Sequence, residues 1–345
     1  MAVSRATLRR ARAIRIMIDD HVEAALRDLV EAWGLAWDTV VDEWQAAALE
    51  LAATRPDGTW HARAVVLRNL RAQRALQLTA QALDELARHA GIRILRDMPT
   101  LLADQEDLLA LLIDTQLPSG VDVGWSRVSA EQLDAIVKRA AGQIESNLNP
   151  LPRQVQAQMK QELIRGVITG SNPNKVASIL VGRLGARFTG GLWRARTIAR
   201  TEMLQAARDA ALQSRIANSD VLQGWRWMCS LSSRTCPSCL AMNGQIFPAD
   251  EPGPDDHPSG RCTAVPVTKT WKELGIDGVD EPASTFPDAK AWFAQQTPKV
   301  QKDIMGQARL DALNQGKISW SDMSVKQHNP GWRDSYVTPP LNRRR

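Results

Sequence analysis

Hydrophobic residues recur at steps of three and four along most of this chain, and this spacing places them on one face of a helix. In the first 40 residues the series comprises Ile14, Ile18, Val22, Leu26, Leu29, Trp33 and Trp37. The pattern predicts helices from residue 5 to about residue 116, interrupted by a turn at 56–60 and by Gly91. Two or three long helices joined by short turns are typical of a bundle or a helical arm.

The helical pattern resumes after 117–125, a stretch whose glycine and proline are typical of a domain boundary. Ser129, followed three residues later by Gln132, predicts a capping box at the start of the next helix. Pro150 and Pro152 are expected to end that helix, because proline cannot continue the backbone hydrogen bonding.

Three further segments complete the helical part of the pattern. One helix is expected to close at Gly170, and the next to begin with Asn172 as its cap and Pro173 at its first position. The segment FTGGLW, 188–193, is expected to be a loop because of its paired glycines. A long alanine-rich helix is then predicted over 193–219.

The pattern changes after residue 220, where β-formers alternate with turn residues. Alternation in GWRWMCS predicts that Trp225, Trp227 and Cys229 share one strand face, with Arg226 and Met228 on the other. We expect two or three short strands, over 224–230, 244–249 and 262–271.

Together these elements predict an α+β fold that is predominantly α. A helical N-terminal arm is expected over 1–125, and a compact domain over 126–285 in which the long helix packs on a small antiparallel sheet. Helix returns over 286–345 and ends in an irregular basic tail.

Composition excludes few classes of function. The net charge of +5 and the 44% hydrophobic content are ordinary for a globular protein. No run of 18 apolar residues is free of charges, so we expect no transmembrane helix and no membrane partner. The first 20 residues lack a long apolar run and a cleavage-like site, so a signal peptide is not expected.

Charge is uneven along the chain even though the total is small. Residues 183–234 contain nine arginines and three acidic residues, whereas 246–288 contain nine acidic residues and three basic ones. The two stretches could neutralise each other, or the arginines could contact DNA phosphates.

Three of the four cysteines and one histidine gather in a stretch rich in proline and glycine. Cys236 and Cys239 form a C-x2-C pair, His257 follows after seventeen residues, and Cys262 after four more. Cysteine thiolates and a histidine imidazole are the donors of tetrahedral structural zinc sites. The pattern therefore predicts a Cys3His zinc knuckle that replaces a missing apolar core in this loop.

Other interpretations of the same residues stay open. A redox pair normally opens a helix in a thioredoxin-like βαβ unit, which the pattern does not predict, and a disulfide does not suit a reducing compartment. The cluster could also be a former metal site held by hydrogen bonds. Cys229 is expected to be a buried apolar residue, and Asp255 and Asp256 to be solvated loop acids. A catalytic zinc would need an open position and a base such as Glu202.

A family resemblance enters at these motifs. Over roughly 160–266 the chain resembles the phage head morphogenesis family, the minor head proteins related to the Mu F protein. The matching motifs are Ala199, Arg200, Thr201 and Glu202 on the helix, Trp225 and Trp227 on the strand, Arg234, Thr235, Cys236 and Cys239 in the knuckle, Asn243 and Gly244 in the turn, and His257, Arg261 and Cys262 at the closure. Two positions depart from the family pattern: serine at 232 and 233 replaces an aspartate, and Gly260 replaces the first cysteine of a C-R-C ending.

The resemblance implies a low-copy virion protein that associates with the portal or major capsid protein and acts in head assembly, DNA packaging or ejection. It implies no catalytic activity. It also implies that the protein lies inside the head or at the portal vertex, after assembly in the host cytoplasm. We expect the helix motif, Arg200, Thr201 and Glu202, to fix the helix against the knuckle or the strands. Two alternatives stay open for these residues: contact with the portal or with double-stranded DNA independent of its sequence, and a catalytic role of the Arg/Glu pair. A zinc-dependent hydrolase or nuclease and a zinc-containing DNA-binding regulator remain alternative functions.

Overall fold

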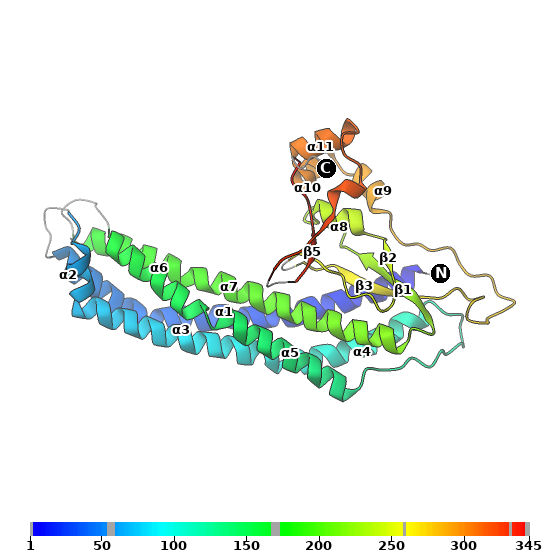
Figure 1. Cartoon of the computed structure of the whole chain (residues 1–345), viewed down its shortest axis with the longest axis horizontal. Coiled ribbons are helices and arrows are strands. Elements are labelled where there is room, and N and C mark those ends of the chain that lie inside the picture. Colours follow the sequence, from blue (N-terminus) through cyan, green and yellow to red (C-terminus); the bar gives the residue numbers. More distant parts are fainter. Residues whose placement is uncertain (1–2, 54–58, 167–172, 258–259, 331–332, 342–345) are drawn as a thin grey trace. The chain divides into compact units, whose positions relative to one another are not determined.

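The computed structural model describes residues 3–53, 59–166, 173–257, 260–330 and 333–341 (Figure 1). Its helices are α1 (Arg5–Ala53), α2 (Arg63–Arg68), α3 (Leu70–Arg96), α4 (Met98–Asp114), α5 (Ala130–Leu148), α6 (Leu151–Arg165), α7 (Pro173–Ala217), α8 (Pro237–Met242), α9 (Ala289–Ala294), α10 (Pro298–Met305), α11 (Gln307–Asn314) and the 3-10 turn η1 (Ser321–Met323). Its strands are β1 (Leu222–Met228), β2 (Ile246–Phe247), β3 (Thr263–Thr268), β4 (Val325–Gln327) and β5 (Ser335–Val337). The predicted α+β, mostly α class is confirmed.

The chain forms two compact units whose segments alternate along the sequence. The first unit comprises Met1–Asp20, Pro99–Ile136 and Leu204–Arg345, and the second comprises His21–Met98 and Val137–Met203. The division into 1–125, 126–285 and 286–345 describes successive stretches of chain and stays a prediction. The cap at Asn172, the closure at Gly170, the turn at 56–58 and the basic tail at 342–345 lie outside the described residues.

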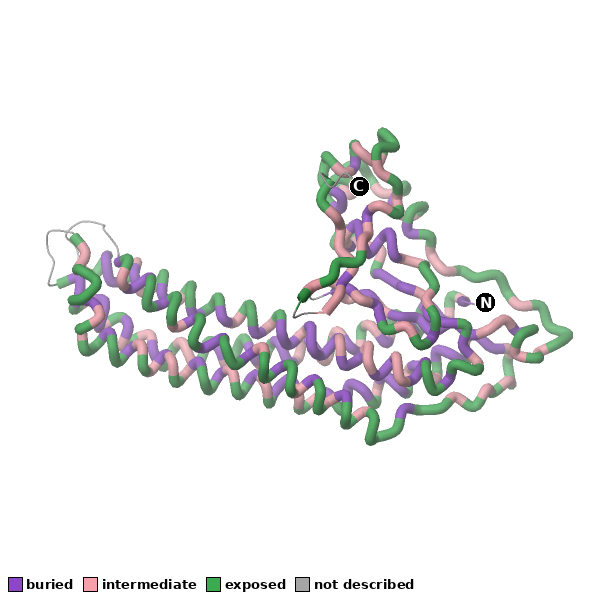
Figure 2. The backbone as a smooth tube through the Cα atoms, in the orientation of Figure 1, coloured by how far each residue is buried: buried purple, intermediate pink, exposed green. Residues whose placement is uncertain are grey.

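The second unit is a helical bundle with tryptophans in its core. The Trp33 indole of α1 donates a 3.0 Å hydrogen bond to the Phe188 carbonyl of α7, and Trp44 of α1 donates one of 2.9 Å to the Thr79 hydroxyl of α3. Buried positions follow one face of each helix, as the purple segments of Figure 2 show. This arrangement buries the apolar stripes that the sequence pattern predicted.

The expected loop at 188–193 is wrong, because α7 continues through it as helix. A Cβ added at Gly191 would lie 2.9 Å from Trp33 Cζ2 and 2.9 Å from Val155 Cγ2. Gly191 therefore lets α1 and α6 approach the α7 backbone closely, and this packing outweighs the weak helix propensity of glycine.

Gly91 does not end its helix either, since α3 runs through it to Arg96. A single glycine costs only about 1 kcal/mol in a helix interior, which tertiary contacts offset. Arg93 instead stabilises the end of the helix, where it forms ion pairs with Asp28 and Asp97. α6 ends at Arg165, and Gly166 at its C-cap has a φ of 61°.

The first unit contains a three-stranded antiparallel sheet of order β2-β1-β3. The prediction of two or three short strands is confirmed, and Trp225 and Trp227 of β1 are both buried. Arg215 in the C-terminal turn of α7 places its guanidinium 5.3 Å from the Trp225 ring and donates to the carbonyls of Ala249 and Glu251. The last part of α7 is therefore packed against the sheet, as predicted.

The C-terminal segment differs from the expectation in two ways. Helix returns as three short helices, α9 to α11, because Pro298 and Gly306 interrupt the backbone pattern. The tail is not irregular throughout: β4 and β5 pair as an antiparallel hairpin. Tyr336 of β5 packs edge-on against Trp227 at 5.6 Å and donates its backbone N–H to the carbonyl of Asp255.

Candidate metal centre

The C-x2-C pair lies at the start of the short helix α8. Cys236 is the N-cap residue, and its Sγ accepts a 3.3 Å hydrogen bond from the backbone N–H of Cys239. A side chain that accepts a hydrogen bond is favoured at the N-cap, because it satisfies a backbone N–H that has no partner within the helix. The pair therefore does open a helix, but strands β1 and β2 flanking it are antiparallel rather than part of a βαβ unit.

The second half of the cluster comes from the loop before β3. His257 and Cys262 both lie in this loop, where Gly260 donates its N–H to the His257 carbonyl at 2.8 Å. Cys262 is buried, whereas the His257 side chain is 37% exposed. All four cysteines carry free thiols, so the disulfide interpretation has no support in this geometry.

The structure gathers the donors into two overlapping groups that share Cys239. Donor atoms of Cys236, Cys239 and His257 lie within 4.8 Å of one another, and so do those of Cys239, Asp256 and Cys262. The four predicted ligands thus come together in part, with Cys262 in the second group. Two thiols and an imidazole at this separation have the chemistry and spacing to hold a metal ion such as zinc.

Asp256 is the residue that the sequence interpretation missed, and its expected solvation is wrong. Its side chain is 1% exposed. Its Oδ1 accepts the His257 N–H at 2.8 Å, and its Oδ2 accepts the Cys262 N–H at 2.9 Å. Only Asp255 behaves as an outer acid, since its carboxylate pairs with Lys326 at 2.8 Å. Two adjacent acids look alike in sequence, and the fold alone separates them.

Electrostatics divide the thiols into one acidic and several inert groups. A hydrogen bond with Cys239, opposed by burial and helped by His257, lowers the pKa of Cys236 to about 5. Hydrogen bonds with Cys236 and Cys262, together with burial, raise the pKa of Cys239. Burial raises the pKa of Cys229 to about 12, as suits its expected place among apolar neighbours.

Two opposing effects set the pKa values of the closing residues. The hydrogen bond with Cys239 lowers the pKa of Cys262, but burial and the Asp256 carboxylate outweigh it and leave that pKa raised. Burial raises the pKa of Asp256, but Arg208, His257 and the Cys262 amide outweigh it and hold that pKa below its ordinary value. The buried carboxylate is therefore ionised at neutral pH.

A cavity of about 440 Å³ opens over the cluster. Three arginines from separate parts of the first unit line it: Arg15 of α1, the exposed Arg234, and Arg261. The cluster cysteines and the hydroxyl-bearing residues Ser230, Ser232 and Thr235 line the rest. Arg234 thus lies at the site, as the resemblance implied, while its side chain faces solvent.

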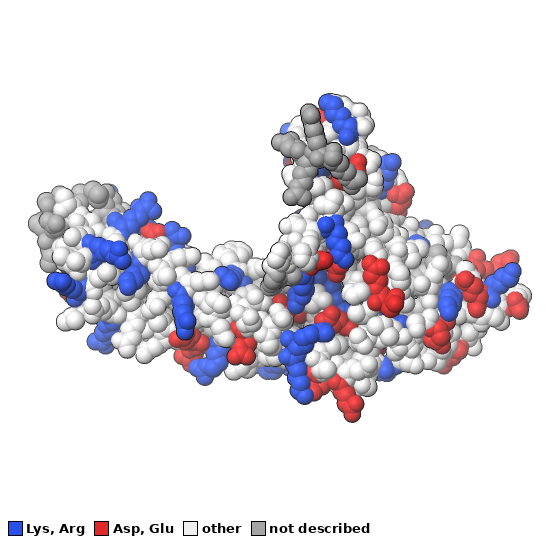
Figure 3. All heavy atoms as spheres, in the orientation of Figure 1, with Lys and Arg blue, Asp and Glu red and all other residues white. Residues whose placement is uncertain are grey.

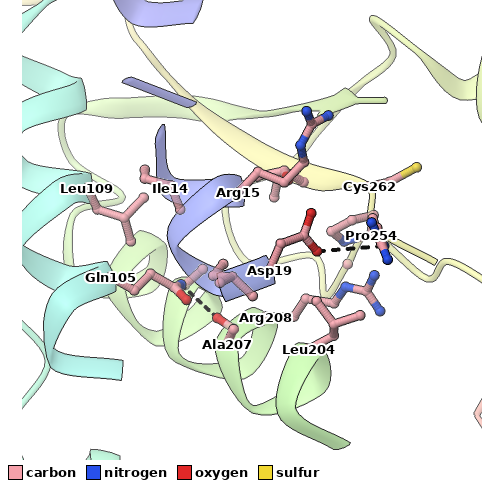
Figure 4. A pocket seen from close by; sticks show the side chains of 16 residues that line it. Ile14, Arg15, Asp19, Gln105, Leu109, Leu204, Ala207, Arg208, Pro254 and Cys262 are labelled. Carbon is pink, nitrogen blue, oxygen red and sulfur yellow. Dashed lines mark hydrogen bonds and ion pairs between the residues drawn. The ribbon is translucent and has the colours of Figure 1, made fainter. Parts of the chain in front are cut away.

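A smaller cavity of about 40 Å³ adjoins the cluster between α1, α4 and α7 (Figure 4). Its wall is mainly apolar. Asp19 and Arg261 form an ion pair at 3.6 Å at its edge, and Gln105 donates to the Ala207 carbonyl at 2.8 Å, as the dashed lines show. These contacts connect α4 to α7, and α1 to the loop before β3 that carries half of the cluster.

Two of the helix motif residues contact helices. Arg200 forms an ion pair with Glu23 of α1, and the Thr201 hydroxyl donates to the Thr197 carbonyl within α7. Glu202 is buried and does not line the cavity over the cluster. Arg200 and Thr201 therefore stabilise helix packing in the second unit, and the expected role of Glu202 stays a prediction.

Two arginines further along α7 hold the helix to the knuckle and sheet instead. Arg208 donates to the Gly260 carbonyl at 2.9 Å and lies 3.8 Å from Asp256 Oδ2, while Arg215 contacts Trp225. Arg208 and Arg215 are seven residues apart, which is two helical turns and hence one face. This spacing of Arg208 and Arg215 is the feature of the sequence from which their shared position on one helix face could be predicted.

The fold and site define a small α+β domain in which a long helix packs on a three-stranded sheet beside a cysteine–histidine cluster able to hold a metal. Residues 157–265 match the model of the family described as Phage Mu protein F like protein, which confirms the resemblance over this stretch. The matched stretch is less than half of the chain, so the finding is a likeness to this family over these residues. No curated protein and no solved structure matches the chain.

Within the described residues, none of the helices combines the length and apolar character needed to cross a membrane.

Proposed function

We propose that this protein is a phage minor head protein that acts in head assembly, associated with the portal or the inner face of the capsid. The observation that carries the proposal is the family match over 157–265, which includes α7, β1, β2, the start of β3 and the whole cluster. The virion would be its final location, after assembly in the host cytoplasm. The helical N-terminal region would provide surface for the portal or the major capsid protein.

The metal in this proposal is a structural zinc. Cys236, Cys239 and His257 form one donor group, and the sequence pattern assigns Cys262 to the fourth position. When bound, zinc would supply a rigid tetrahedral crosslink between α8 and the loop before β3. The residues of α8 and Cys262 also belong to a buried apolar cluster with Trp225 and Trp227, so binding would add to an existing core rather than replace a missing one.

The zinc is tested by elemental analysis of freshly purified chain beside Cys236→Ser, with Cys229→Ser as the matched control. Cys229 is a buried cysteine that belongs to neither donor group. We expect about one zinc per chain in the parent and the control, and loss of zinc with loss of stability in Cys236→Ser. Zinc-free parent protein would overturn the structural-zinc proposal.

The assembly role is tested by co-expression with the portal and major capsid proteins of the phage that encodes the chain. We expect the chain to co-purify with one of them and to be present in mature particles. Phage with the gene deleted should form heads that package DNA poorly or are non-infectious. Normal infectious particles from the deletion would contradict the proposal.

The open cavity over the cluster favours one second candidate, a zinc-dependent hydrolase or nuclease. An open face is a feature of catalytic zinc sites. Against it, Glu202, the base considered from the sequence, is not among the residues that line the cavity. Zinc-dependent cleavage of DNA or of an ester by the parent chain, abolished in Cys236→Ser, would favour this candidate.

A DNA-binding regulator has less support, because many arginines of 183–234 have intramolecular partners. Ion pairs join Arg187 to Glu162, Arg200 to Glu23 and Arg208 to Asp256. Figure 3 shows both signs of charge interspersed over the drawn face. Contact with packaged DNA would then be weak and independent of sequence, and fluorescence anisotropy with two unrelated duplexes at two salt concentrations measures this.

A further inference from the structure

Two residues compete for the fourth position of the metal centre, the predicted Cys262 and the unpredicted Asp256. We infer that Asp256 supplies the fourth donor, through Oδ1, to an ion held also by Cys236, Cys239 and His257, and that Cys262 remains a thiol outside the coordination sphere. This inference rests on the proposed zinc.

The position of Asp256 Oδ1 matches the corner of a tetrahedron. It lies 3.4 Å from Cys239 Sγ and 3.5 Å from His257 Nε2. At the tetrahedral angle, zinc bonds of about 2.3 Å to sulfur and about 2.0–2.2 Å to nitrogen and oxygen give edges of about 3.5–3.7 Å between sulfur and oxygen and about 3.3–3.5 Å between nitrogen and oxygen. The two observed distances are close to these edges. Asp256 and Cys262 both group with Cys239 and with each other rather than with Cys236. The 3.5 Å distance from Oδ1 to His257 Nε2 is the observation that favours Asp256.

Gly260 provides the space for this carboxylate. A Cβ built on Gly260 would lie 2.1 Å from Asp256 Cγ, 2.2 Å from Oδ2 and 2.4 Å from Oδ1. The Asp256 carboxylate thus occupies the position where a side chain at 260 would begin.

The remaining contacts of Asp256 are those of a supported metal ligand. Its Oδ2 accepts the Cys262 N–H, and Arg208 lies 3.8 Å from the same oxygen. Ligating carboxylates are ordinarily held in place by such hydrogen bonds and charges. Cys262 contributes through this backbone N–H, and its buried side chain lies beside Cys239.

X-ray absorption at the zinc edge of the full-length parent protein tests the inference without any substitution. We expect two sulfur and two nitrogen or oxygen donors. Three sulfurs and one nitrogen would overturn the assignment to Asp256 while leaving the structural zinc intact. A parent chain without zinc would overturn both.

Variants add a second readout, zinc affinity measured by competition with a chromogenic chelator. Loss of a residue that only supports a metal ligand typically lowers metal affinity by roughly tenfold to hundredfold. We therefore expect Asp256→Ala to lower zinc affinity by more than roughly hundredfold. Cys262→Ala should lower it by roughly hundredfold at most and leave the number of donors unchanged. Asp255→Ala is the matched control and should keep the parent affinity, since its carboxylate pairs with Lys326. A larger loss in Cys262→Ala than in Asp256→Ala would contradict the inference.

Discussion

Arg208 of α7 lies beside Asp256, with 3.8 Å between Nη2 and Oδ2, and donates a 2.9 Å hydrogen bond to the carbonyl of Gly260. One guanidinium therefore holds both the buried carboxylate and the backbone of the closing loop. The Arg208 side chain is only 13% exposed, so its charge is shielded from water. This contact joins the long helix to the metal centre in the first unit.

Replacing Arg208 by methionine should destabilise the metal-free chain by roughly 3 kcal/mol, because it leaves the Asp256 charge buried without its cation. Arg194→Met is the matched control, since Arg194 is exposed on the same helix and should cost within about 0.5 kcal/mol. Urea denaturation of both variants measures the difference. Equal losses would show that the Arg208 contacts contribute nothing special.

Neighbouring glycines in α7 should respond to alanine with opposite signs. Gly191→Ala should destabilise by about 1–3 kcal/mol, because its Cβ would overlap Trp33 and Val155. Gly190→Ala meets nothing within 4 Å and should stabilise by up to about 1 kcal/mol through helix propensity. Thermal denaturation distinguishes them, and a stabilising Gly191→Ala would refute the close packing of α1 on α7.

In metal-free protein at neutral pH, iodoacetamide should modify Cys236 selectively, because the thiolate is the nucleophile. The pKa of Cys236 is lowered from 9.0 to about 5, whereas the pKa values of Cys229, Cys239 and Cys262 are raised. Mass spectrometry of digests at several pH values should give a midpoint near pH 5. Equal labelling of Cys236 and Cys262 would contradict the asymmetry.

The same lowered pKa has a consequence for stability. A thiolate favoured by the fold contributes stability above the unfolded pKa near 9, and this contribution is lost as the pH falls toward 5. The stability of the metal-free parent should therefore decline over that interval more than the stability of Cys236→Ser. Identical pH profiles would exclude a thiolate at Cys236.

The capping box at α5 gives a test away from the metal centre. Ser129 Oγ accepts the Gln132 N–H at 3.2 Å, and Gln132 Oε1 accepts the Ser129 N–H at 3.1 Å. Ser129→Ala should cost about 1 kcal/mol, whereas Ser129→Gly should cost only a few tenths. Chemical denaturation measures both, and a neutral Ser129→Ala would argue against the cap.

Local physics explains what the sequence by itself determined. The cap at Ser129, the start of α7 at Pro173 and the strand alternation of Trp225 and Trp227 depend on spacing within a few residues, and each is confirmed. The gathering of cysteines and histidine was also readable, because metal donors at fixed spacing leave a local signature.

Only the tertiary structure decided the rest. Gly191 looks like a loop signal until Trp33 packs against it, and Asp256 resembles its solvated neighbour until Gly260 leaves room for its carboxylate. Arg200 resembles a knuckle contact, yet Glu23 is its partner and Arg208 takes the expected role. These outcomes depend on residues distant in sequence. Burial and charge pairing are set by which surfaces pack against each other in the folded chain, and the linear pattern of residues does not specify that packing.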